Sequence, residues 1–222
     1  MSWSPAQRFI AALQRRLAKR PRSRLKVKEF RKAAVLVPLV ERKGVSSLCA
    51  TRSPLSIPLM KRADAGGPHS GQISFPGGQR ESLDDDAVDT ALRETSEEYG
   101  WQRDNVKVLG CLDDELTPSG YVVRPIVGHL PQEPRYSPDH GEVASIFHVP
   151  LDFLLDDRNE IKQTPAEFGG ERYELFEYHF EEHRIWGLTA RILHTLKKLS
   201  LRVMADLDET EEGALEDGKK QN

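Results

Sequence analysis

The sequence has few cysteines and no long apolar run. Cys49 and Cys111 stand alone among 222 residues, without a CxxC pair, so neither a disulfide framework nor a thiolate metal site is expected. No segment approaches the roughly 18 consecutive apolar residues that a membrane-spanning helix needs. The N-terminal segment also lacks the apolar stretch of a secretory signal. These absences predict a soluble protein of a reducing compartment, with the cytoplasm as the expected location.

The seven histidines form no metal-binding pattern. They are not arranged as HxH, as HExxH or in a cluster with cysteine, so the sequence does not support a zinc site. There is also no internal repeat. Any metal chemistry must therefore come from carboxylates, which are abundant.

Charge is unevenly distributed along the chain. Residues 1–32 carry 11 Lys and Arg against one Glu, a net charge of +10; because the whole chain has −3, residues 33–222 carry −13. The segment from Asp206 to Asn222 holds seven acidic residues and few apolar ones, a composition typical of solvated, disordered chain. We therefore predict a basic N-terminal helix or arm over 1–32, a domain over 33–200 and an acidic, disordered tail over 201–222.

Apolar periodicity predicts a mixture of strands and helices. Ser4–Lys19 has apolar residues at helical spacing, and Asp84–Tyr99 and Trp186–Leu199 are further expected helices. Pro150–Leu155 is expected to form a short helix or turn. The expected strands are Ala33–Val40, Ser46–Arg52, Ser56–Met60, Gln72–Phe75, Val106–Leu112, Tyr121–Leu130, Glu142–Val149 and Tyr173–Phe180. Because the strands do not alternate strictly with helices, this order predicts an α/β fold with a mixed sheet covered by helices on both sides.

The helix expected at 84–99 carries a line of acidic residues. Ser82 or one of Asp84–Asp86 can cap its start, and Gly100 is suited to end it. Glu94 and Glu98 are four residues apart and project together, with Glu97 beside them. Like charges at this spacing repel, but a hard cation such as Mg²⁺ would turn them into ligands. A solvated acidic face with Arg93 as a partner is the alternative interpretation.

A glycine loop leads into this helix. Gly77 and Gly78 allow the backbone to approach a substrate closely or to adopt a positive φ, at the end of an expected strand. A loop of this kind followed by a carboxylate-rich helix suits metal-assisted cleavage of a diphosphate.

This region resembles the Nudix hydrolases, whose box is Gly-x5-Glu-x7-Arg-Glu-U-x-Glu-Glu-x-Gly-U, with U a bulky apolar residue. Fourteen residues separate Gly78 from the arginine where the box has thirteen, so the early acid is Asp84 counted from the glycine or Asp85 counted from the arginine. Thr95 replaces the first bulky apolar residue. The matching residues are Arg93, Glu94, Glu97, Glu98, Gly100 and Trp101. The resemblance implies the Nudix α/β/α sandwich with a mixed sheet.

Further segments resemble the coenzyme A pyrophosphatase branch of the family. They are Thr51-Arg52-Ser53, the stretch from Gly71 to Gly78, the stretch from Leu116 to Tyr121, Glu142-Val143 before Val149-Pro150-Leu151, and the stretch from Ile185 to Arg191. The branch has an arginine where this chain has Ile57 and Gly67, and Lys61 and Arg62 are the nearest candidates to replace it. The implied reaction is hydrolysis of coenzyme A or acyl-coenzyme A to 3′,5′-ADP and 4′-phosphopantetheine or its acyl form.

The resemblance also implies roles for individual residues. Glu94 and Glu98, together with Glu97, would bind Mg²⁺ or Mn²⁺, and Arg93 would orient a glutamate. Glu142 is our candidate for the general base, with a surface glutamate as its alternative and Glu115 as a second candidate. Catalytic roles thus fall to Glu97, Glu142 and Arg93, and substrate contacts to Arg52, Gly77 and Gly78. His69, in the loop before Gly71, is a further candidate for contact with a phosphate or ribose, with a solvent-facing loop residue as the alternative interpretation.

Two other functions compatible with this sequence remain. A Nudix hydrolase could act on a nucleotide sugar, a dinucleotide or an RNA 5′ end, and the basic arm could support the last through phosphate contacts. A non-catalytic nucleotide-binding module is the second, against which the complete set of glutamates argues. A small-molecule nucleotide is the favoured partner, and the oligomeric state is left open.

Overall fold

The structure is a computed structural model that describes residues 4–25, 29–42, 55–64, 66, 70–168 and 171–219. The strand expected at Ser46–Arg52 lies outside the described residues. The elements are α1 (Pro5–Lys19), β1 (Arg31–Glu41), β2 (Leu55–Arg62), β3 (Ile73–Ser74), β4 (Gly77–Gln79), α2 (Ala87–Tyr99), η1 (Arg103–Asn105), β5 (Lys107–Cys111), β6 (Glu115–Leu116), β7 (Tyr121–Leu130), β8 (Val143–Pro150), α3 (Leu151–Leu155), η2 (Asp157–Asn159), β9 (Glu160–Phe168), β10 (Glu171–Phe180), β11 (His183–Trp186) and α4 (Gly187–Lys219).

The central sheet is mixed. Its main path is β3-β2-β1-β7-β5, with β4 paired to β1, β6 to β7 and β8 to β2. β1 and β7 run parallel, from Arg31 opposite Tyr121 to Val40 opposite Leu130, and the other pairs are antiparallel. β9, β10 and β11 form a separate antiparallel sheet. The predicted mixed sheet is confirmed.

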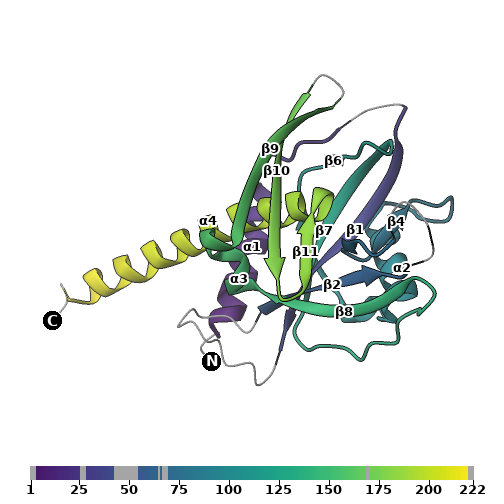
Figure 1. Cartoon of the computed structure of the whole chain (residues 1–222). Helices are drawn as coiled ribbons and strands as arrows, with labels where there is room; N and C mark the ends of the chain where they lie inside the picture. Colours follow the sequence, from purple (N-terminus) through teal and green to yellow (C-terminus); the bar gives the residue numbers. More distant parts are fainter. Residues whose placement is uncertain are drawn as a thin grey trace.

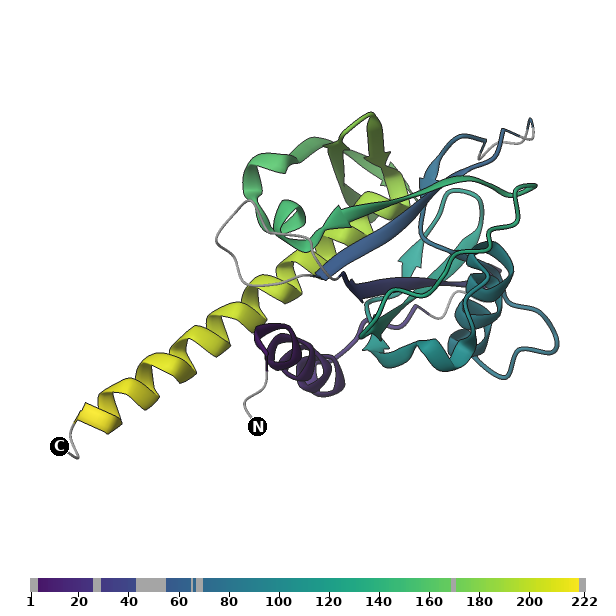
Figure 2. The same cartoon turned by 90° about the horizontal axis from the view of Figure 1, so that it is seen from below.

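Helices cover both faces of the central sheet, as Figures 1 and 2 show. Alternate residues of β1 point to opposite sides: Leu36 and Val40 join one buried cluster with α2, whereas Val37 and Leu39 join another with α1 and α4. Both faces of this strand are therefore apolar, which explains its nearly continuous hydrophobic sequence. The predicted α/β/α sandwich is confirmed.

α1 belongs to the core on one face of the sheet. The side chain of Ser4 accepts a hydrogen bond from the backbone N–H of Gln7 and completes a capping box at the helix start. The apolar face is buried against α4 and β5, with Leu13 fully inaccessible. β1 begins at Arg31, so the boundary expected between an arm at 1–32 and a domain at 33 has no structural counterpart.

The caps of α2 agree with the prediction, although its first turn is shorter. Among the candidates, Asp86 caps the helix by accepting hydrogen bonds from two backbone N–H groups, and Gly100 ends it in the left-handed conformation with φ 72°. The helix begins at Ala87 rather than at Asp84. The difference arises because Asp84 is used in a buried ion pair, described below.

The C-terminal third of the chain differs from the prediction. β9 was not expected. β11 includes Trp186, where the helix was expected to start, so α4 begins at Gly187. α4 then continues to Lys219, where a disordered tail was expected over 201–222. Figure 2 shows α4 extending away from the body of the protein. Charge composition predicts solvation, but Glu, Leu, Ala and Lys also favour helix, and this local preference is what the structure displays.

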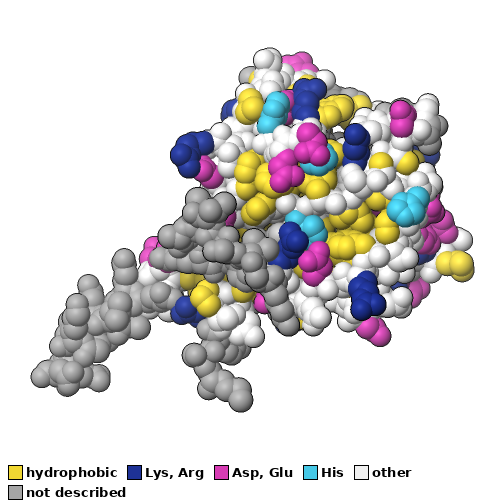
Figure 3. Space-filling model, turned by 60° about the horizontal axis from the view of Figure 1, so that its bottom comes forward, with side chains coloured by type: hydrophobic (Ala, Val, Ile, Leu, Met, Phe, Trp, Pro, Cys, Tyr) yellow, Lys and Arg dark blue, Asp and Glu magenta, His cyan; other side chains and the backbone are white. Residues whose placement is uncertain are grey.

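The surface mixes charges of both signs. The face drawn in Figure 3 has acidic and basic side chains near one another, with hydrophobic side chains between them. None of the helices in the described part of the chain is long and apolar enough to cross a membrane.

Candidate active site

The glycine loop and α2 approach each other closely. A Cβ atom on Gly78 would lie 2.4 Å from a carboxylate oxygen of Glu94, and one on Gly77 would lie 2.4 Å from the carbonyl oxygen of Ala34 in β1. Gly77 also has φ 156°, and its N–H donates to Glu98 Oε2 at 2.8 Å. Both glycines are therefore required by packing, since any side chain would displace a glutamate or the sheet.

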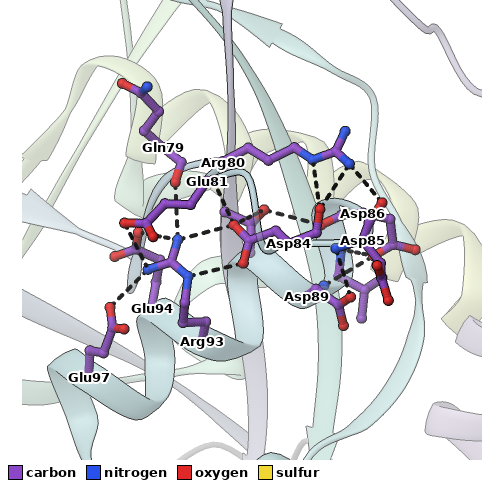
Figure 4. Close-up of polar contacts among 12 residues, drawn as sticks. Gln79, Arg80, Glu81, Asp84, Asp85, Asp86, Asp89, Arg93, Glu94 and Glu97 are labelled. Carbon is purple, nitrogen blue, oxygen red and sulfur yellow. Dashed lines mark hydrogen bonds and ion pairs between the residues drawn. The ribbon is translucent and has the colours of Figure 1, made fainter.

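Arg93 connects this loop to the glutamates of α2 (Figure 4). Its guanidinium donates to both carboxylate oxygens of Asp84, at 3.0 and 3.2 Å, and to the carbonyl oxygen of Gln79 at 3.1 Å. It also forms ion pairs with Glu94 and Glu97, each at 2.9 Å. One planar side chain thus holds three carboxylates and the loop backbone in fixed relative positions.

Asp84 is the acid that faces this arginine. Its side chain is 4% exposed and also accepts hydrogen bonds from the Thr90 hydroxyl and the Glu81 N–H. The hydrogen bond from Arg93 holds the pKa of Asp84 down to about 2. Asp85 is exposed. The sequence leaves open whether the early acid of the box is Asp84 or Asp85. The structure therefore favours Asp84, the residue counted from the glycine, and the extra residue lies in the turn before α2.

Glu98 is buried at the end of this arrangement. Its side chain is 2% exposed, and it accepts hydrogen bonds from Gly77 N–H and from Arg62 Nη1, the latter at 3.2 Å. Burial raises its pKa to about 7, against the opposing effect of both donors. Burial likewise raises the pKa of Glu94. Carboxylates in such surroundings are strong candidates for a functional site.

Arg62, at the end of β2, brings Glu142 to the same place. Its Nη2 lies 3.8 Å from Glu142 Oε2 while its Nη1 contacts Glu98. Glu142 immediately precedes β8 and has a side chain that is 55% exposed, so it lies at the open edge of the site. Glu142 and Glu98 therefore share one guanidinium. Glu115, the second candidate, instead forms an ion pair with Arg191 of α4.

The donor atoms of this site suit a hard cation. Glu94, Glu97 and Glu98 offer only carboxylate oxygens, the ligand type that Mg²⁺ and Mn²⁺ prefer. Their ligand atoms are not gathered as tightly as those of Glu181, Glu182 and His183 in the β10–β11 turn, which lie within 4.8 Å of one another and form the only such group among the described residues. Arg93 and Arg62 instead engage the α2 glutamates.

Two predicted substrate contacts, Arg52 and His69, lie outside the described residues. Ile57, where the family branch has an arginine, is fully buried in β2. Sequence reasoning named Arg62 only as a displaced candidate and missed its contact with Glu98. The only available signal was its position at the end of a strand, 36 residues before Glu98.

The chain belongs to the Nudix family. The model of the NUDIX domain matches residues 31–169, which include the glycine loop, α2 and Glu142. The protein is therefore a Nudix hydrolase, a class of pyrophosphohydrolases that generally use divalent metal cations.

Its relatives include bacterial and mitochondrial members of this family. The chain is 35% identical to the uncharacterized Nudix hydrolase NudL of Pectobacterium atrosepticum over 85% of this chain and 91% of that protein. It is 36% identical to the mitochondrial coenzyme A diphosphatase NUDT8 of Homo sapiens over 84% of this chain and 72% of that protein. Among solved structures, a MutT/nudix family protein from Enterococcus faecalis is similar with a TM-score of 0.48 and 15% identity, over 87% of this chain and 79% of that one.

Proposed function

We propose that this Nudix hydrolase cleaves the phosphoanhydride bond of coenzyme A or acyl-coenzyme A. The products would be 3′,5′-ADP and 4′-phosphopantetheine or its acyl form. The observation that carries the proposal is the 36% identity to the human mitochondrial coenzyme A diphosphatase over 84% of this chain. The stretch from Gly71 to Gly78, which resembles the coenzyme A branch, leads directly to the α2 glutamates and supports the same substrate.

Glu94 and Glu98, with Glu97, are the residues that we assign to Mg²⁺ or Mn²⁺. A bound cation of this kind neutralises diphosphate charge and lowers the pKa of a water nucleophile. Arg93, itself held by buried Asp84, keeps Glu94 and Glu97 on one side of the helix. In this proposal Arg93 is a positioning residue rather than a substrate contact.

We assign the general base to Glu142. It lies at the exposed edge of the site and shares Arg62 with Glu98, so a water between them would be within reach of both carboxylates. Replacing Glu142 with Gln should lower kcat and flatten the acid limb of the pH–rate profile, with metal affinity retained. Glu167→Gln, an exposed position on β9, is the matched control. A reduced rate with an unchanged acid limb would assign Glu142 to positioning or metal binding instead.

Arg62 is the cation that we assign to a substrate phosphate. Ile57 is buried in the core and cannot supply a cation, whereas the Arg62 side chain is 31% exposed and contacts Glu98. A guanidinium binds phosphate through two parallel hydrogen bonds, which an ammonium group does not reproduce. Arg62→Lys should therefore raise KM for a phosphorylated substrate more than it lowers kcat.

The deciding experiment compares kcat/KM for coenzyme A, its 3′-dephospho form, a nucleotide sugar and a dinucleotide with Mg²⁺ and with Mn²⁺. Coenzyme A is expected to give the highest value, and 3′,5′-ADP should appear among the products. If another diphosphate is cleaved and coenzyme A is not, the substrate assignment fails and the chain remains a Nudix hydrolase of different specificity. A 5′-triphosphate RNA in the same screen tests the alternative suggested by the basic N-terminal residues. Absence of any hydrolysis would favour a binding module.

A further inference from the structure

A basic groove lies on the opposite side of the central sheet from α2. It is a cavity of about 770 Å³ between α1 and α4, and the turn after β5 contributes Asp113 to its wall. Six cationic side chains line it: Arg15, Arg16, Lys19, Arg20, Lys198 and Arg202. Asp113 and Asp206 are the acidic residues of the lining, so the groove has an excess of positive charge.

The two helices present these charges as facing stripes. Arg15, Arg16 and Lys19 follow at helical spacing on α1, and Lys198 and Arg202 are four apart on α4. The helices are held together beneath them by buried apolar residues, among them Leu13 and Leu196. The positions of the cations are therefore set by the core and not by their mutual interactions.

Only part of this charge is compensated within the described residues. Arg16 pairs with Asp206 at 2.6 Å and Arg20 with Asp113 at 2.8 Å. Arg15, Lys19 and Arg202 form no ion pair with any residue that the structure describes. Like charges gathered on one helix pair repel one another, and a polyanion in the groove would relieve this repulsion.

We propose that this groove binds a small molecule carrying two or more phosphate groups. Its volume falls within the range of roughly 300–1,000 Å³ that is typical of small-molecule sites. Arg15 and Arg202, which form no ion pair with a described residue, provide the planar donors that match phosphate oxygens. The site is distinct from the catalytic one, because the sheet separates it from the α2 glutamates. The inference does not depend on the proposed coenzyme A specificity.

The test uses inorganic tripolyphosphate as the probe and the full chain in buffer with a chelator, so that no metal bridges the probe to the catalytic glutamates. Titration calorimetry is expected to give one saturable site per chain. Arg15→Glu combined with Arg202→Glu should weaken binding at least tenfold. Lys107→Glu combined with Arg135→Glu changes the net charge equally at exposed positions outside the groove and should bind as the original protein does. Circular dichroism and basal hydrolysis should be unchanged in both double variants.

Four results would overturn the proposal. The first is the absence of saturable binding in the original protein. The second is an equal loss of affinity in the two double variants, which would indicate a general effect of net charge. Loss of binding in Glu98→Gln would locate the probe in the catalytic site. Finally, single-stranded oligonucleotides whose affinity rises with length and exceeds that of tripolyphosphate would make the groove a nucleic-acid surface. Equal binding by Glu98→Gln and the original protein supports the separate site.

Discussion

The two faces of the central sheet are stabilised by different interactions. On the α2 face, buried charges are joined by directional bonds: Asp84 and Glu98 are almost inaccessible, and arginines contact both. On the α1/α4 face, contact is made by apolar side chains such as Leu13, Leu193 and Leu196, each fully buried. The basic residues of the groove lie outside that core.

Because of this difference, substitutions on one face should mainly affect catalysis and substitutions on the other should mainly affect stability. A directional network loses its geometry when one donor or acceptor changes, although little apolar area is lost. An apolar layer loses free energy of unfolding in proportion to the volume removed, while the site on the other face keeps its geometry. Substitutions on the two faces should therefore have different consequences, and each prediction below uses that contrast.

The largest expected effect is on turnover, at Glu98. Glu98→Gln keeps the size of the side chain but removes the charge that we assign to the cation, so kcat should fall by at least about two orders of magnitude. Steady-state kinetics at saturating Mg²⁺, together with Mn²⁺ binding measurements, check this. Glu209→Gln, an exposed glutamate of α4, is the control and should be unaffected. Turnover near the original value in Glu98→Gln would refute the metal assignment.

The next effect is on stability, at Leu13 of α1. Leu13→Ala leaves a cavity in a fully buried position and should lower the free energy of unfolding by about 2–5 kcal/mol. Below its unfolding transition the variant should retain kcat. Urea denaturation measures the change, with Leu201→Ala as control because Leu201 is 40% exposed on α4. Equal, small effects at both positions would mean that residues 1–32 act as the detachable arm expected from their charge.

A smaller effect on stability is expected at Asp84, whose buried side chain forms the ion pair with Arg93. Asp84→Asn leaves a partly buried arginine without its main partner, although Arg93 retains Glu94 and Glu97. We expect a loss of about 2–3 kcal/mol, below the 3–5 kcal/mol typical of a fully buried pair. Asp85→Asn, one residue along and exposed, should change stability by less than about 0.5 kcal/mol. A larger loss of stability in Asp85→Asn than in Asp84→Asn would mean that Asp85, and not Asp84, forms the ion pair with Arg93.

The pKa of Asp84 also predicts how the stability of the protein changes at acid pH. Its pKa is about 2 in the folded protein, below the usual 3.8, so between these values the unfolded chain binds more protons. Its contribution to stability is fully present above about pH 4 and is lost as the pH falls toward 2. Asp84→Asn should therefore show a shallower loss of stability in this range than Asp85→Asn.

The helices and strands with a clear pattern of apolar or capping residues could be predicted from the sequence. α1 follows helical spacing, β1 is an apolar run, and the caps of α2 at Asp86 and Gly100 are recognisable residue by residue. β9 lacks such a signal: Glu160–Phe168 contains mostly exposed residues, because it lies in a sheet with much of its surface in solvent. Its pairing with β10 is decided by tertiary contacts.

The residues of the α2 part of the candidate site could be predicted from the sequence, but the contacts between residues far apart in the chain could not. Spacing along a helix predicts that Glu94 and Glu98 project together, and that much requires no tertiary structure. It cannot choose between Asp84 and Asp85, since one inserted residue before the helix shifts the count without indicating which acid turns inward. Nor can it predict the contact between Arg62 and Glu98, since this contact depends on how the folded sheet brings the end of β2 to α2.

The smallest predicted effect concerns His148, a partly buried polar residue on the α2 face. Its ring contacts the Ser56 and Tyr136 hydroxyls and a Glu133 carboxylate oxygen, each at 2.9 Å. Burial lowers its pKa to about 4; Glu133 opposes the shift, whereas the charge of Arg42 adds to it. Below about pH 6.5 the unfolded chain gains a proton at this residue that the folded protein does not yet bind.

Stability should therefore fall as the pH drops from about 6.5 to about 4, by at most about 3 kcal/mol from this residue. His148→Gln removes the titration and should flatten this part of the curve, although lost packing lowers stability at pH 7 as well. His140→Gln, in the exposed turn before β8, should retain the slope. Urea unfolding at intervals between pH 7 and pH 4.5 measures both variants. Identical slopes would mean that His148 protonates freely in the folded protein and that this part of the α2 face is open to water.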